Sequence, residues 1–193
     1  MRGHFSVAKV EPKRKIAEFI DGKLVDDSQR VAICIKGSQL GFPATVEAFR
    51  PSFPFGLNYY IETETEAERM KQGVVDPFQI SVRPRFAKGI MSFLTRLFLF
   101  ESRGQPVGSK KFEGKYISSY NDMETAERFI RYPGVEEAID NLNQLTQFND
   151  LVVRAKYGVY LSQSQSFNAA DIDVVRETFK ELAKLGQVLF DAF

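Results

Sequence analysis

The residue types that most often carry catalysis are scarce in this chain. His4 is the only histidine and Cys34 the only cysteine among 193 residues. Nucleophilic triads and most zinc sites need at least one firmly held histidine, and His4 stands close to the start of the chain. The usual glycine-rich phosphate motifs, zinc-protease motifs, nucleophile elbows and Cys-x-x-Cys pairs are absent. We therefore expect no catalytic residue, no cofactor and no metal site.

Two further candidates for chemistry have simpler explanations. Cys34 lies in RVAICIKG, a run typical of a strand, and its neighbours Ile33 and Ile35 favour a small buried apolar role over a nucleophilic one. Glu62, Glu64 and Glu66 alternate, so an extended chain would put them on one face, where they could hold a hard cation such as Ca²⁺. No Asp/Gly loop surrounds them, which favours a solvated strand end.

A basic, apolar segment at residues 83–104, RPRFAKGIMSFLTRLFLFESRG, is the strongest candidate for a binding surface. When residues 86–100 are drawn on a helical wheel, the large apolar residues cover about half of the circumference. Lys88 and Arg96 lie on the other half. We interpret the segment first as a helix that covers the core, with its basic ends reaching water. The alternative is a membrane or partner surface, formed by Arg83, Arg85, Lys88, Phe93, Leu94, Arg96 and Leu97.

Composition is that of an ordinary globular protein. Hydrophobic residues make up 44% and charged residues 26% of the chain, and 18 phenylalanines with no tryptophan indicate a core rich in Phe. The formal net charge of +1 gives no overall field for nucleic acid. No signal-peptide pattern and no apolar stretch of membrane-spanning length is present. We expect a cytoplasmic protein, with attachment to the membrane surface as the alternative. Whether a targeting segment precedes Met1 is a separate question that the sequence leaves open.

The first half of the chain reads as about five strands. KIAEFIDGKLV alternates around Asp21-Gly22, a hairpin signal. The other strands are RVAICIKG, ATVEAF, GLNYYIET and DPFQISVRP. Turns rich in Gly and Pro separate them.

The second half of the chain mixes strands with helices. FEGKYISSY reads as a strand that leads into a helix capped by Asn121, and Pro133 fits the first turn of a second helix. DLVVRAKYGVYLSQS reads as a hairpin turning near Gly158. A last helix, capped by Asn168, has an apolar face that includes Phe190.

These patterns predict one α+β domain, with a mainly antiparallel sheet and packed helices. The second half follows the order strand, helix, helix, hairpin, helix. The domain could have two lobes, residues 1–104 and 105–193.

The layout resembles that of a group of uncharacterised bacterial proteins. The resemblance rests on GSKKFEGKYISSYNDMETAERFI, and RVAICIKG to FLTRLFLF fits the outline of their upstream sheet. It covers roughly residues 30 to 193 and departs at Glu113, where the group often has Asp. Some members of the group follow a membrane-spanning segment. The resemblance implies the fold and supplies no activity or site.

The absence of a catalytic constellation favours a non-catalytic binding or protein-interaction module, with a protein as the expected partner. One alternative is a peripheral membrane protein that binds through residues 86–100. A second is an enzyme that uses carboxylate, lysine or tyrosine side chains in a pocket.

Overall fold

The computed structural model describes residues 15, 17–25, 31–49, 57–63, 78–85, 106–155, 157–163 and 172–192. These residues form an α+β fold, as the sequence predicts, built on one eight-stranded sheet. The strands are β1 (Lys23–Val25), β2 (Val31–Gln39), β3 (Phe42–Phe49), β4 (Leu57–Ile61), β5 (Gln79–Pro84), β6 (Tyr116–Tyr120), β7 (Asp150–Arg154) and β8 (Gly158–Gln163).

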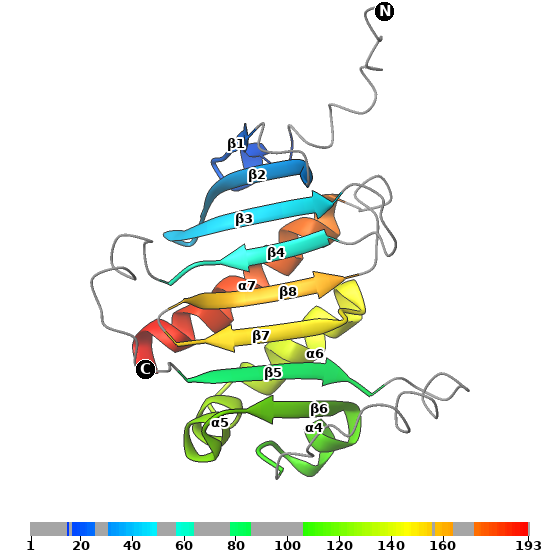
Figure 1. The fold of residues 1–193 in the computed structure, drawn as a ribbon, viewed down its shortest axis with the longest axis vertical. Coiled ribbons are helices and arrows are strands. Elements are labelled where there is room, and N and C mark those ends of the chain that lie inside the picture. Colours follow the sequence, from blue (N-terminus) through cyan, green and yellow to red (C-terminus); the bar gives the residue numbers. More distant parts are fainter. Residues whose placement is uncertain are drawn as a thin grey trace, which may run out of the picture.

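The strand order is β1-β2-β3-β4-β8-β7-β5-β6, and every neighbouring pair is antiparallel (Figure 1). The first four strands form a meander in which each strand pairs with the next. Beyond β4 the order departs from the sequence, because β8 and β7 lie between β4 and β5. Residues 1–104 and 105–193 thus both contribute strands to one continuous sheet.

Helices cover one face of this sheet in the described part of the chain. They are α4 (Lys110–Lys115), α5 (Met123–Ile130), α6 (Val135–Thr146) and α7 (Ile172–Ala192). α7 packs against β2, β3, β4 and β8 and against α6, and Figure 1 shows α6 and α7 behind the strands. The core lies between these layers, where the buried rings of Tyr59 and Phe179 meet edge-on at 5.3 Å.

The alternation of side chains along the strands gives the sheet two different faces. Tyr59 and its cross-strand partner Leu161 are fully buried on the helix side. The next residues, Tyr60 and Tyr160, form a pair on the opposite face, and polar residues flank them. We call this second face, turned away from α6 and α7, the outer face.

The predicted five strands in the first 84 residues are confirmed, but the first predicted hairpin is wrong. Residues 17–19 are helical where a strand was expected, and the chain turns at Ile20 and Asp21 before β1. The Gly22 N–H donates to the carbonyl of Ala17 at 2.7 Å, which closes the helical turn. A terminal glycine of this kind is as typical of a helix end as of a hairpin.

The predicted strand FEGKYISSY begins too early, because its first residues form the short helix α4. Ser109 caps this helix by accepting a hydrogen bond from the Phe112 N–H at 3.2 Å. The Glu113 carboxylate accepts from the N–H groups of Val107 and Gly108 at 2.9 and 3.0 Å. These bonds satisfy N–H groups at and just before the start of α4, and only Tyr116–Tyr120 remain as β6.

The predicted starts of α5 and α6 each need a correction. Asp122, rather than Asn121, caps α5 by accepting from the Glu124 N–H, while Asn121 accepts from the Gln79 N–H at 2.8 Å across the sheet edge. Pro133 lies in the turn before α6, which begins after Gly134 in the left-handed conformation.

The last helix has the predicted apolar face, with one exception. Val175, Phe179, Leu182 and Leu189 are buried, but Phe190 is 67% exposed and its ring lies edge-on to that of Phe42, with the centroids 6.2 Å apart. The predicted cap, Asn168, lies outside the described residues.

Candidate functional site

The outer face of the sheet carries a hollow of about 660 Å³, which we call the outer-face hollow. Strands β4, β5, β6, β7 and β8 supply its lining, so the strand order brings distant parts of the chain together there. The lining residues are Tyr60, Ile61, Glu62, Gln79, Ser81, Arg83, Ser119, Asp150, Val152, Arg154, Tyr157, Gly158, Val159 and Tyr160.

Two tyrosine rings stand next to each other in this hollow. Tyr60 and Tyr160 are direct cross-strand partners, and their ring centroids lie 5.0 Å apart at an interplanar angle of 41°. The Tyr160 hydroxyl donates to the Asn58 side-chain oxygen at 3.2 Å. Burial raises the pKa of both tyrosines above its ordinary value of 10.0, which is itself well above neutral pH, so both hydroxyls are protonated. The pair combines apolar ring surface with hydrogen-bonding groups.

A charged pair lies beside the rings. Arg83 Nε is 3.5 Å from Asp150 Oδ1, and the same oxygen accepts from the Ser81 hydroxyl at 2.6 Å. The Arg83 and Asp150 side chains are 43% and 25% exposed, so a ligand in the hollow can reach both. An ion pair this exposed contributes only about 0–1 kcal/mol to stability. The contribution of this ion pair to fold stability is therefore too small to account by itself for the two charges lying together.

A second polar pair completes the lining. Arg154 Nε donates to the Gln79 side-chain oxygen at 2.9 Å across β7 and β5. With Glu62, the lining then has two cationic and two carboxylate side chains. The lining contains neither imidazole nor thiol among the residues that the structure describes. The arrangement offers many hydrogen-bond donors and acceptors beside aromatic rings, which is the composition of a binding site.

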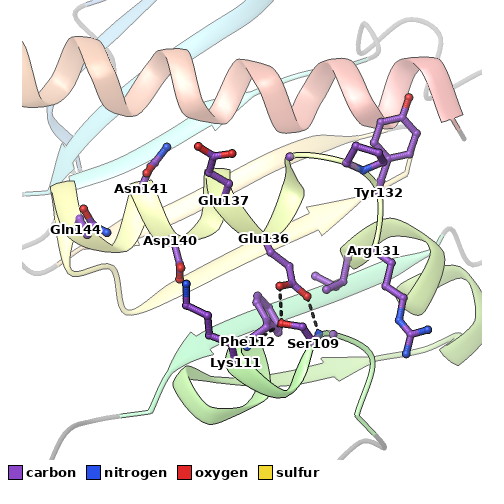
Figure 2. A pocket seen from close by; sticks show the side chains of 14 residues that line it. Ser109, Lys111, Phe112, Arg131, Tyr132, Glu136, Glu137, Asp140, Asn141 and Gln144 are labelled. Atoms are coloured by element: carbon purple, nitrogen blue, oxygen red, sulfur yellow. Dashed lines mark hydrogen bonds between the residues drawn. The ribbon is translucent and has the colours of Figure 1, made fainter.

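A second hollow of about 800 Å³ lies on the helix side, between α4, α6 and the turn that joins α5 to α6 (Figure 2). Two of its carboxylates, Glu136 and Asp140, hold neighbouring elements together. Glu136 accepts from the Ser109 N–H at 2.6 Å and from the Ser109 hydroxyl at 2.7 Å, which ties α6 to the start of α4. Figure 2 shows this contact as two dashed lines. This contact gives Glu136 a structural role in joining α4 to α6.

Asp140 extends the same connection between α6 and the segment from α4 to β6. Its carboxylate accepts from Lys115 Nζ at 2.5 Å and from the Tyr116 hydroxyl at 2.8 Å. Partial burial acts to raise the pKa of Asp140, but the hydrogen bonds from Lys115 and Tyr116 outweigh burial and hold this pKa below its ordinary value of 3.8.

Asp140→Asn tests this connection through its pH dependence. A carboxyl whose pKa is lowered by folding stabilises the native state above the unfolded pKa, and this contribution disappears as pH falls through the native pKa. We expect the variant to lose about 0.5–1 kcal/mol of unfolding free energy at pH 7. The loss should shrink as pH falls below the unfolded value of 3.8 and through the lower native pKa. Urea unfolding at pH 7, 4 and 2.5 measures it, and a loss that is independent of pH would contradict the role of the charge.

The structure places two of the seven residues predicted as a membrane or partner surface. Arg83 lies on the outer face and lines the hollow. Arg85 donates from Nε to the Tyr116 carbonyl at 3.0 Å, so it braces the start of β6. The other five lie outside the described residues and stay a prediction, namely Lys88, Phe93, Leu94, Arg96 and Leu97.

The minor candidates have separate outcomes. Cys34 is buried as predicted, with its Sγ 4.0 Å from a Glu47 carboxylate oxygen. Glu62 lines the outer-face hollow, while His4, Glu64 and Glu66 lie outside the described residues. Among the residues that the structure describes, no cluster of His, Cys, Asp and Glu could hold a metal ion. The described helices also include none long and apolar enough to cross a membrane.

Sequence reasoning missed most of the outer-face hollow. Tyr60, Asp150 and Tyr160 were assigned to strands but not to a site. The available signal was the alternation in LNYYI and GVYLSQ, which places Tyr60 and Tyr160 opposite the core residues of the same strands. Which strand pairs with which could not be inferred, so their meeting across β4 and β8 was not predicted.

The fold and the hollow together define an α+β protein with a helix-covered antiparallel sheet and a polar, aromatic outer face. Comparison with protein-family models, curated proteins and solved structures finds no match. The resemblance to uncharacterised bacterial proteins therefore stays a prediction.

Proposed function

We propose that the protein is a non-catalytic binding protein and that its ligand occupies the outer-face hollow. The observation that carries this proposal is the cross-strand assembly of the Tyr60–Tyr160 ring pair and the Arg83–Asp150 charged pair in one hollow. Partly exposed aromatic and charged side chains are the groups that binding sites use for contact and orientation.

The volume and lining also fit a ligand site. About 660 Å³ lies within the range of about 300–1,000 Å³ usual for small-molecule sites. Four of the five strands beneath the hollow, β4, β8, β7 and β5, are interior strands of the sheet that pack on the core, so most of the side chains project from a rigid support. A site of this kind loses little entropy on ordering when its ligand binds.

Amide chemical shifts, measured by NMR with mixtures of common metabolites and short peptides, test the proposal. We expect shift changes that cluster on β4, β5, β7 and β8, and we expect the ligand to be recovered unchanged. Tyr160→Ala should abolish the changes, and Tyr132→Ala, in the helix-side hollow, should leave them intact. A ligand that is chemically converted would overturn the non-catalytic part of the proposal.

Binding elsewhere would contradict the proposed site. Shift changes confined to the helix-side hollow would move the site to α4 and α6. Association with anionic vesicles, with no small ligand at the outer face, would favour the alternative of a membrane-surface protein.

A further inference from the structure

The balance of charge in the outer-face hollow restricts its ligand. We infer that the hollow takes a neutral, polyhydroxylated ligand of the kind represented by a sugar ring, an inference that rests on the proposed function. Arg83 and Arg154 are matched by Glu62 and Asp150 among the lining residues. A ligand with a net charge would gain one partner and meet one repulsion, whereas a neutral ligand disturbs no existing pair.

The polar side chains offer donors and acceptors in adjacent pairs. Arg83 can only donate and the Asp150 carboxylate can only accept, and the two lie 3.5 Å apart. A hydroxyl group both donates and accepts. Two neighbouring ligand hydroxyls can therefore bridge this pair, one accepting from the guanidinium and one donating to the carboxylate, while the ion pair stays intact.

The Gln79–Arg154 pair adds further hydrogen-bonding groups on the same face, four residues along β5 from Arg83. Arg154 Nε donates to the Gln79 side-chain oxygen at 2.9 Å, and the Gln79 amide group can donate in turn. Ser81, Gln79 and Arg83 alternate along β5, so both pairs stand on the same face. Four residues of a strand span about 13 Å, so one sugar ring would reach one of these pairs and a chain of sugar rings could use both.

The tyrosine pair supplies the remaining feature. A sugar ring has one face of C–H groups, which packs on an aromatic ring, and hydroxyls at its rim. Tyr60 and Tyr160 present such rings from neighbouring strands, beside the polar pairs rather than opposite them. Aromatic side chains that keep a hydroxyl suit a surface that is apolar at one end and wet at the other.

The test uses ¹⁵N-labelled full-length protein titrated separately with four probes. These are D-glucose, maltotriose, inorganic phosphate and glycylglycine, and amide shifts and tyrosine fluorescence are recorded for each. The chain has no tryptophan, so its fluorescence reports on tyrosine alone. We expect saturable shift changes at the outer-face hollow with glucose or maltotriose, and none there with phosphate or glycylglycine.

Four variants and a control distinguish the contribution of the Tyr160 ring from that of the Arg83 guanidinium. Tyr160→Ala should weaken sugar binding about tenfold or more, since the ring is lost. Tyr160→Phe, which keeps the ring, should weaken it less. Arg83→Lys should weaken sugar binding about as much as Arg83→Gln, because lysine keeps the charge and loses the planar pair of donors. Tyr132→Ala is the matched control on the helix side and should leave affinity unchanged.

The remaining outcomes overturn the inference in distinguishable ways. Phosphate or glycylglycine binding at the hollow, with no sugar binding, would replace the ligand class and leave the proposed binding function in place. If none of the four probes changed the amide shifts at the hollow, the inference of a polyhydroxylated ligand would be rejected. The proposed ligand site itself would fail if the metabolite and peptide mixtures also caused no shift changes at the outer face.

Discussion

Phe179→Ala is expected to lower the free energy of unfolding by about 3–5 kcal/mol. Phe179 is fully buried on α7, and its ring meets the Tyr59 ring edge-on at 5.3 Å. The substitution removes this contact and leaves a cavity between α7 and β4, where neighbouring side chains collapse only in part. Urea denaturation monitored by circular dichroism measures the loss, and an unchanged unfolding midpoint would contradict the described packing of α7.

Phe190→Ala is the matched control, with the same substitution on the same helix. Phe190 is 67% exposed, so its removal should change stability by no more than about 0.5 kcal/mol. Phe179→Leu, which keeps most of the buried volume, should cost less than the alanine variant. Equal losses at the two phenylalanines would show that burial on the sheet side of α7 is not what distinguishes them.

Gly158→Ala is the second change with a large expected effect. Gly158 begins β8 with φ +114°, and a Cβ built there would lie 1.9 Å from the carbonyl oxygen of Ile61 on β4. The obstacle is backbone, so no side-chain rotation relieves it. We expect a loss of more than about 4 kcal/mol or failure to fold, measured by soluble yield and thermal unfolding.

Alanine variants of three other glycines distinguish the two causes of this loss, which are the positive φ and the clash of the new Cβ with backbone. Gly41→Ala has a positive φ of +85° and open space around the new Cβ, and it should cost only about 1 kcal/mol. Gly37→Ala has a clash of 2.0 Å with the Ile20 carbonyl oxygen without a positive φ. Gly114→Ala has neither and should be neutral or slightly stabilising. If Gly158→Ala were no worse than Gly41→Ala, the close approach of β8 to β4 would be contradicted.

The parts of the fold that depend on local pattern could be predicted from the sequence. Apolar runs between turns rich in Gly and Pro predict β2 to β5, and an apolar helical face predicts α7. The errors lie where two local structures share one signal. Ser109 and Glu113 support the short helix α4 through bonds to the backbone, but the alternation of KFEGKYISSY equally describes a strand.

The site was harder to predict than the fold, because it depends on pairing between distant strands. Asn58 and Tyr160 are 102 residues apart in sequence and share a hydrogen bond. No period or motif in either strand specifies the other as its neighbour. Arg83 was identified for its basic charge, and only the sheet shows that its carboxylate partner is Asp150 on β7.

The position of β8 also has a consequence for the order in which a ribosome could build the protein. β1 to β4 emerge early and can form their meander at once, since each pairs with its neighbour in sequence. β4 must then wait for β8, and β5 must wait for β6 and β7. One edge of β4 and both edges of β5 therefore lack their partners until the later strands are made, and unpaired edges attract other chains. Synthesis of the last third of the chain therefore competes in time with the association of unfinished copies through these edges.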